Sequence, residues 1–145
     1  MSALDLAKQL IQTEEGLNLK IYPDSKATWA IGWGRNLSLK GISKDEADLL
    51  LTNDLKGNQE AVDRLFSDSA LSCMGEARQA VLMSMAHQLG AFGLSKFRRM
   101  IAALDQGDWV AASQEALDSQ WARQTPARAQ RAAEVLKTGK LEIPS

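Results

Sequence analysis

The sequence predicts an α+β protein in which a small antiparallel sheet lobe and a larger helical lobe are joined by a long helix. Three observations predict this class. Two short segments rich in β-formers flank the turn residues Pro23-Asp24-Ser25-Lys26. An apolar stripe at helical spacing then follows Ser43 for about twenty residues. The second half of the chain carries repeated helical patterns with capping signals. We expect the sheet lobe at about 12–42, the connecting helix at about 43–66, and the helical lobe at about 74–145 together with the N-terminal helix.

Composition limits the classes of protein that fit. With 145 residues, 45% hydrophobic and 24% charged, the chain is expected to form one globular domain, 1–145, with two lobes. A net charge of −1 argues against nucleic-acid binding driven by counterion release. Cys73 is the only cysteine and no Cys/His spacing fits a metal, so we expect neither a disulfide, nor a metal, nor a cofactor. The first fifteen residues interleave charged and apolar positions, so we expect synthesis in a cytoplasm and no stable membrane insertion.

The N-terminal elements follow from periodicity and turn chemistry. A helix is expected between an N-cap at Ser2 and a terminating Gly16, because the residues between them form an apolar stripe: Ala3, Leu6, Ala7, Leu10 and Ile11. Strands are expected at 19–22 and 28–31, and a third near 36–39.

The later elements follow mainly from caps. Ser43 and Glu46 form a capping box that starts the long helix. The segment 76–89 is apolar nearly all round and is expected to be a central buried helix. The remaining signals predict breaks at Gly90 and Gly93, a helix capped by Ser95 that runs to Leu104, a helix capped by Asp108 that runs to Leu117, and a last helix from Pro126 to just before Gly139.

Glu15 and Asp24 are the candidate chemical groups. Glu15 stands in the last turn of the first helix, at the negative end of the macrodipole, where a carboxylate costs roughly 0.3–1 kcal/mol when exposed. This end of the dipole favours the protonated form that a general acid needs. Asp24 stands in the hairpin turn nearby, and two carboxyl groups that face one gap indicate glycoside hydrolysis. A solvated surface glutamate is the alternative interpretation of Glu15.

Four ordered blocks resemble the bacteriophage-type lysozymes, the endolysin muramidases. They lie at 15–24 (EGLNLKIYPD), 31–37 (IGWGRNL), 41–47 (GISKDEA) and 119–129 (SQWARQTPARA). The similarity runs from about residue 5 to Gly139. Several blocks in the same order over nearly the whole chain are a more specific signal than one short motif.

The resemblance implies hydrolysis of the β-1,4 bond between N-acetylmuramic acid and N-acetylglucosamine in peptidoglycan. It implies a cleft between the lobes, inversion at the anomeric carbon, Glu15 as general acid and Asp24 as the carboxylate that helps to activate water. Arg128 would pair with Glu15, and Arg35, Gln88 and Gly90 would line the substrate cleft. It further implies no cofactor, a monomer, synthesis in a host cytoplasm, and action on the wall in the periplasm at the end of a phage cycle, after a holin-type pore has opened the membrane.

Two positions depart from the family pattern. Ala30 stands where the family carries a threonine that positions the attacking water, and Ala27 stands where it carries a glycine in the turn. Because alanine cannot hold a water by a hydrogen bond, Ala30 predicts weakened water activation, unless Thr28 or another donor takes its place or Asp24 alone serves as base. Two alternatives therefore stay open: a lytic transglycosylase, which uses the sugar's own 6-hydroxyl in place of water, and a catalytically weakened wall-binding module.

Overall fold

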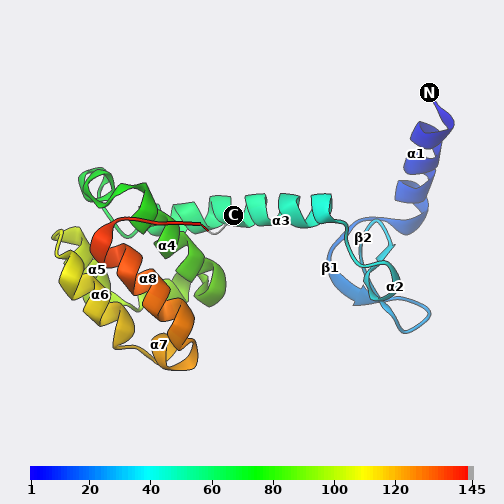
Figure 1. Cartoon of the computed structure of the whole chain (residues 1–145). Helices are drawn as coiled ribbons and strands as arrows, with labels where there is room; N and C mark the ends of the chain where they lie inside the picture. The colour runs from blue at the N-terminus through cyan, green and yellow to red at the C-terminus, as the bar shows by residue number, and fades with distance from the viewer. Residues whose placement is uncertain (144–145) are drawn as a thin grey trace. The chain divides into compact units, whose positions relative to one another are not determined.

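The computed structural model describes residues 1–143 and confirms the α+β class, with helices and one three-stranded antiparallel sheet (Figure 1). The elements in chain order are α1 (Ala3–Glu15), β1 (Asn18–Pro23), β2 (Trp29–Gly32), β3 (Arg35–Asn36), α2 (Leu37–Lys40), α3 (Lys44–Asp63), α4 (Asp68–Ser95), α5 (Arg98–Asp105), α6 (Trp109–Leu117), α7 (Gln120–Gln124) and α8 (Pro126–Thr138). The chain divides into two compact units, Met1–Leu49 and the part from Leu50 onward, which we call the sheet unit and the helical unit. The long helix α3 contains the boundary between them.

Local signals at both ends of α1 explain its length. The Ser2 hydroxyl accepts the N–H of Asp5 at 3.1 Å, and the Asp5 carboxylate accepts the Ser2 N–H in return, which completes a capping box. At the other end Gly16 takes φ +71°, which a glycine adopts without steric cost, and its N–H bonds Gln12 O. Both predicted ends of α1 are therefore confirmed.

The sheet has the order β1-β2-β3, with both pairs antiparallel. Tyr22 pairs with Ala30, and Ala30 pairs with Asn36 on its other side, so Ala30 lies in the central strand. The third strand is shorter than expected, because Asn36 ends it. The Asn36 side chain accepts the N–H of Leu39 at 3.0 Å and starts the short helix α2, which replaces the predicted strand near 36–39.

The start of α3 agrees with its predicted capping box. Ser43 Oγ accepts the Glu46 N–H at 3.1 Å, and Glu46 Oε1 accepts the Ser43 N–H at 2.9 Å. The helix continues through Gly57 without interruption and ends at Asp63.

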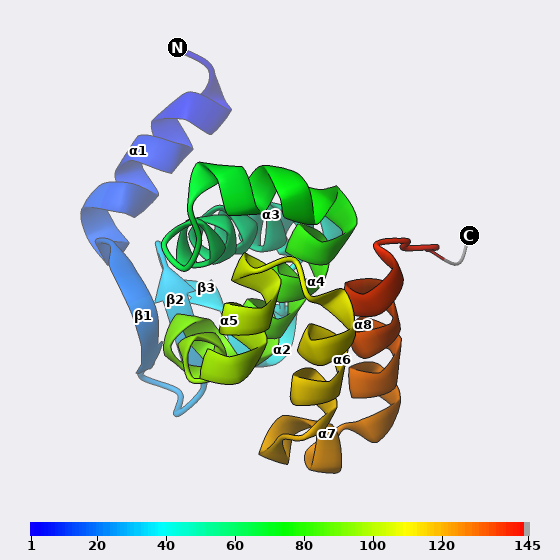
Figure 2. The same cartoon turned by 90° about the vertical axis from the view of Figure 1, so that its left-hand side faces the viewer.

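In the helical unit, α4 contacts α5 and α8 (Figure 2). Together, buried side chains from α4 to α8 form most of the core. Met74, Leu82 and Met85 of α4 are fully buried. The backbone of α4 leaves helical geometry at Gly75 and Gly90, so the predicted break at Gly90 is confirmed. Gly93 stays helical, which corrects the second predicted break.

The α5 boundary also differs from expectation. The sequence predicts Ser95 as the N-cap of the following helix, but its hydroxyl donates to Phe92 O at 2.6 Å and Ser95 is the last residue of α4. The N-cap of α5 is Phe97, which makes no side-chain capping bond. The α6 cap at Asp108 and the α8 start at Pro126 agree with prediction.

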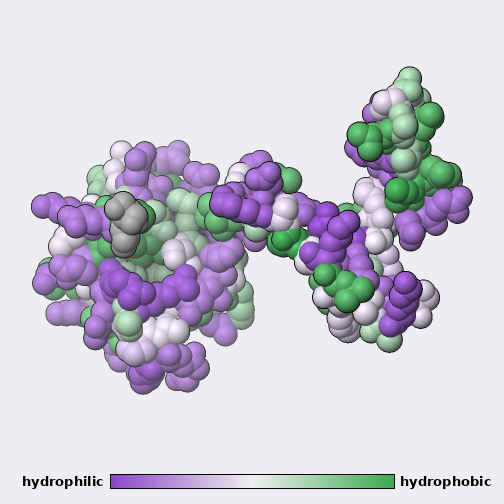
Figure 3. Space-filling view, turned by 45° about the vertical axis from the view of Figure 1, so that its right-hand side comes forward, coloured by the Kyte–Doolittle hydropathy of each residue, from purple (hydrophilic) through white to green (hydrophobic). Residues whose placement is uncertain are grey.

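Apolar side chains lie on the surface of α1 (Figure 3), where Leu4, Leu6, Leu10 and Ile11 are exposed and no residue is buried. The expectation that α1 joins the helical lobe stays a prediction. No helix in residues 1–143 has the length and apolar character needed to cross a membrane.

Candidate active site

Glu15 is the last residue of α1, and its side chain lies against the backbone of Gly34 in the hairpin that follows β2. A methyl group on Gly34 would lie 3.1 Å from both Cδ and Oε2 of Glu15. Gly34 has φ +85°, so a glycine serves both the backbone conformation and the close approach of this carboxyl group. The structure therefore places the predicted acid beside the turn that joins β2 to β3.

Asp24 begins the turn between β1 and β2 and accepts three hydrogen bonds. Its Oδ1 accepts the N–H groups of Lys26 at 2.9 Å and Thr28 at 3.0 Å, and its Oδ2 accepts the Thr28 hydroxyl at 2.5 Å. These bonds favour the carboxylate, and the Thr28 hydroxyl is the largest cause of a lowered pKa at Asp24. Asp24 is therefore held as an anion, which suits a base.

Of the side chains linked to Asp24, Thr28 is the donor that the sequence offers in place of the missing hydroxyl at Ala30, whereas sequence reasoning did not select Asn36. Thr28 is contacted in turn by Asn36, whose Nδ2 donates to Thr28 Oγ1 at 3.1 Å. Asn36 lies on β3, eight residues further along the chain, and only the pairing of β2 with β3 brings it beside Thr28. The Asp24-x-x-x-Thr28 spacing alone is a usable signal for the first contact, since the side chain of an aspartate commonly binds the turn that follows it.

The two departures from the family pattern have different structural settings. Ala27 takes φ +60°, the one residue other than glycine with positive φ among those described, which explains why a glycine suits this position. Ala30 is 2% exposed, and its side chain is part of the packed interior of the sheet unit.

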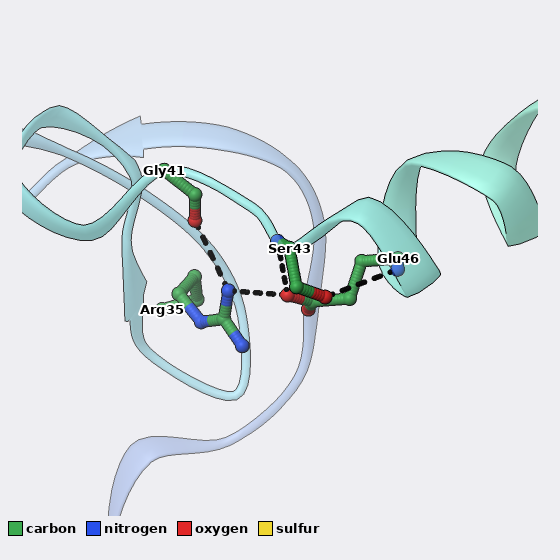
Figure 4. Close-up of polar contacts among 4 residues, drawn as sticks. All are labelled: Arg35, Gly41, Ser43 and Glu46. Carbon is green, nitrogen blue, oxygen red and sulfur yellow. Dashed lines mark hydrogen bonds and ion pairs between the residues drawn. The ribbon is translucent and has the colours of Figure 1, made fainter.

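Arg35 lies at the start of β3 and is held by the segment that leads into α3 (Figure 4). Its Nη1 donates to Gly41 O at 3.0 Å and to Glu46 Oε1 at 2.9 Å. Glu46 Oε1 also accepts the Ser43 N–H, and the Arg35 hydrogen bond is the main reason why the pKa of Glu46 falls to about 2. We call the four residues Arg35, Gly41, Ser43 and Glu46 the Arg35 clamp.

Three candidate residues lie in the helical unit. Arg128 on α8 donates from Nη2 to both the carbonyl and the hydroxyl of Ser84, at 3.2 and 3.0 Å. Gln88, one turn after Ser84 on α4, accepts the Trp121 indole N–H at 2.8 Å. Gly90 follows with φ +80°, and a methyl group there would meet nothing within 4 Å.

The structure thus brings the candidate residues together in two groups. Glu15, Asp24, Ala30 and Arg35 belong to the sheet unit, whereas Gln88, Gly90 and Arg128 belong to the helical unit. The pairing of Arg128 with Glu15 and the cleft that would join the two groups remain predictions. Within residues 1–143, no group of three or more His, Cys, Asp or Glu side chains is arranged to hold a metal ion.

Comparison with known proteins gives consistent results. The phage lysozyme family model matches residues 12–136. Among individual proteins, the chain is 28% identical over 92% of its length to the pre-baseplate central spike protein Gp5 of Enterobacteria phage T4, of which it spans only 28%. It is 26% and 25% identical to the probable T4-type lysozymes 2 and 1 of Dictyostelium discoideum, over 93% and 92% of its own length and 95% of theirs.

Proposed function

Because the chain belongs to the phage lysozyme family, which supports a muramidase-like function, we propose that it hydrolyses the β-1,4 bond between N-acetylmuramic acid and N-acetylglucosamine in peptidoglycan. The observation that carries this proposal is the family match over residues 12–136 together with the presence of Glu15 and Asp24 in one compact unit. Glu15 donates its proton to the glycosidic oxygen, and Asp24 accepts a proton from the attacking water. This pathway inverts the anomeric carbon and needs roughly 6.5–9.5 Å between the two carboxyl groups.

The test is the release of soluble fragments from purified Gram-negative sacculi by the wild type, Glu15→Gln and Asp24→Asn. Glu14→Gln is the matched control, because Glu14 is an exposed glutamate in the same helical turn. We expect both active-site variants to lose at least about a hundredfold in rate, as loss of a general acid or base typically costs. The control should digest the wall like the wild type. Equal digestion by wild type and Glu15→Gln is the outcome that refutes the proposal.

Mass spectrometry of the same digest distinguishes the alternative reactions. Reducing ends identify a hydrolase, and 1,6-anhydromuramic ends identify a lytic transglycosylase. Binding to sacculi without any released product identifies a wall-binding module.

Arg35, Gln88, Gly90 and Arg128 are proposed to line the glycan cleft. Arg128→Gln tests this set, because it removes the charge of a side chain whose described hydrogen bonds go to the uncharged oxygens of Ser84. We expect a reduced kcat/KM with little change in stability. A reduced stability with unchanged kcat/KM would assign Arg128 a structural role only.

The proposal extends to the arrangement and biology of the chain. We propose that the protein is a monomer and that a holin-type pore admits it to the periplasm. Expressing cells should lyse only when the inner membrane is permeabilised, and lysis of intact cells would refute the pore requirement.

A further inference from the structure

The hydrogen bonds around Asp24 have a defined direction. Asn36 Oδ1 accepts the N–H of Leu39, so its amide nitrogen must be the group that faces Thr28 Oγ1. An amide nitrogen only donates, and therefore the Thr28 oxygen accepts this bond. The single Thr28 hydroxyl proton is then free to point at Asp24 Oδ2, 2.5 Å away. We call this chain of contacts, from Asn36 through Thr28 to Asp24, the relay.

The relay leaves Asp24 with little acceptor capacity. A carboxylate offers about four lone-pair positions. The two on Oδ1 match the N–H donors of Lys26 and Thr28, and one on Oδ2 matches the Thr28 hydroxyl. One acceptor position therefore remains, on Oδ2, and the side chain is only half-buried. The turn thus fixes both the rotation of the carboxylate and the place at which it can take one more proton donor.

We propose that Thr28 and Asn36 are positioning residues that aim the last acceptor position of Asp24 Oδ2 at the attacking water, an inference that rests on the proposed function. In this step the water oxygen forms a bond to the anomeric carbon while the bond from that carbon to the glycosidic oxygen breaks. The water proton moves to Asp24 Oδ2, and the Glu15 proton moves to the leaving oxygen. Atoms and charges balance without another reactant.

The setting of Ala30 supports this assignment. Ala30 is the Cα partner of Asn36 and is 2% exposed, so its side chain offers neither a hydroxyl nor an open surface to a water. Thr28 lies two residues before Ala30, just ahead of β2, and Asn36 is the partner of Ala30 on β3. The two residues that orient Asp24, Thr28 and Asn36, are thus both neighbours of Ala30, the position that lacks a hydroxyl. The Thr28 hydroxyl of the relay is also the largest cause of the lowered pKa of Asp24, so it favours the ionised form of this base.

The experiment measures the titration of the Asp24 carboxyl carbon by NMR and the pH dependence of sacculus digestion in the same variants. Thr28→Val removes the hydroxyl at nearly constant shape, and Thr28→Ser restores it. Asn36→Asp keeps the oxygen that caps α2 but replaces the donor that faces Thr28. Ser25→Ala removes a hydroxyl from the same turn at an exposed residue and is the control.

We expect Thr28→Val and Asn36→Asp to raise the midpoint of the Asp24 titration and to move the acid limb of the activity profile to higher pH. At optimal pH, kcat should fall roughly ten- to a hundredfold with KM nearly unchanged, since a misplaced catalytic group costs about that much. Thr28→Ser should restore the titration midpoint, and Ser25→Ala should match the wild type in both measurements.

Two results overturn the relay: an unmoved Asp24 titration in Thr28→Val, or a moved titration with unchanged kcat. Both leave the proposed function standing if Glu15→Gln and Asp24→Asn are inactive. A wild-type protein that releases no fragments refutes the proposed function and the positioning role together, whatever the titration shows.

Discussion

Replacing Gly139 with alanine tests how the last helix is fastened to the helical unit. Gly139 ends α8 in the left-handed conformation, with φ +73°. The Arg78 side chain lies directly against it, and a methyl group on Gly139 would lie 2.8 Å from Nη1 and 3.0 Å from Cζ of Arg78. Arg78 is 8% exposed, and its guanidinium donates to Leu136 O at 2.7 Å and to Met74 O and Lys137 O at 3.2 Å. It also lies 3.9 Å from the ring centre of Trp109.

Two costs add in Gly139→Ala. The left-handed conformation costs alanine about 1–2 kcal/mol, and the stiffer unfolded chain returns about 0.4–1 kcal/mol of this. The methyl group must also displace the guanidinium, and the loss of one charge-assisted hydrogen bond costs about 1.5–3 kcal/mol. We therefore expect a total loss of about 3 kcal/mol, which lowers Tm by about 10 °C for a chain of this size.

Gly107→Ala is the matched control, measured by urea denaturation alongside Gly139→Ala. Gly107 has φ +72°, but a methyl group there would lie 3.8 Å from the Trp109 ring, an ordinary contact. It should lose only the backbone cost, about 1 kcal/mol. In an Arg78→Met background the excess loss of Gly139→Ala should disappear, as a double-mutant cycle requires. Equal losses at positions 139 and 107 in the wild-type background would refute the reasoning.

Three further outcomes are expected. Gly34→Ala should lower the rate of wall digestion, because its methyl group would push on Glu15. Gly75→Ala, at a similar positive φ with open space, should lose stability without that loss of rate, and equal rates of the two variants in a digestion assay would contradict this. Ala27→Gly should raise the free energy of unfolding by up to about 1 kcal/mol, because glycine adopts a φ of +60° without strain. A lower free energy of unfolding in urea denaturation would show that the turn is not strained. The Arg35 hydrogen bond lowers the pKa of Glu46 from 4.5 to about 2, so the stabilisation by this carboxylate is complete above about pH 4.5 and is lost as the pH falls through 2. Glu46→Gln should therefore reduce the loss of stability between pH 4.5 and 2. An unchanged dependence of the free energy of unfolding on pH would contradict this.

Helix ends were predictable because their causes are local. The Ser2 cap, the Ser43–Glu46 box, the Asp108 cap and the Pro126 start each depend on residues within one turn of the chain. The same logic explains the error at α2. Asn36 and Gly41 carry the signals of a helix cap and a helix end, but the alternation of Leu37 and Leu39 with polar residues between them favours a strand prediction.

Contacts that depend on register or on distant helices were not predictable. The Asn36 to Thr28 bond exists because β3 pairs with β2 at a particular register, and spacing alone does not give that register. Arg78 lies in a segment that reads as apolar nearly all round, and its acceptors are up to 59 residues away. For Ala30, the resemblance to the family predicts that the position matters for water activation. It does not predict that the side chain is buried, which depends on how the sheet unit packs.

The Arg78 and Arg35 contacts differ in how protons affect them. The described acceptors of Arg78 are backbone carbonyl oxygens, which do not titrate in the pH range where proteins fold, so acid does not remove the acceptors that hold Arg78 against α8. The Arg35 clamp depends on a carboxylate, and protonation of Glu46 removes its charge. Acidification to about pH 2 should therefore weaken the Arg35 contact at the start of α3, whereas the hydrogen bonds from Arg78 to the end of α8 keep their acceptors. The two arginine contacts of this chain thus differ in their sensitivity to acid.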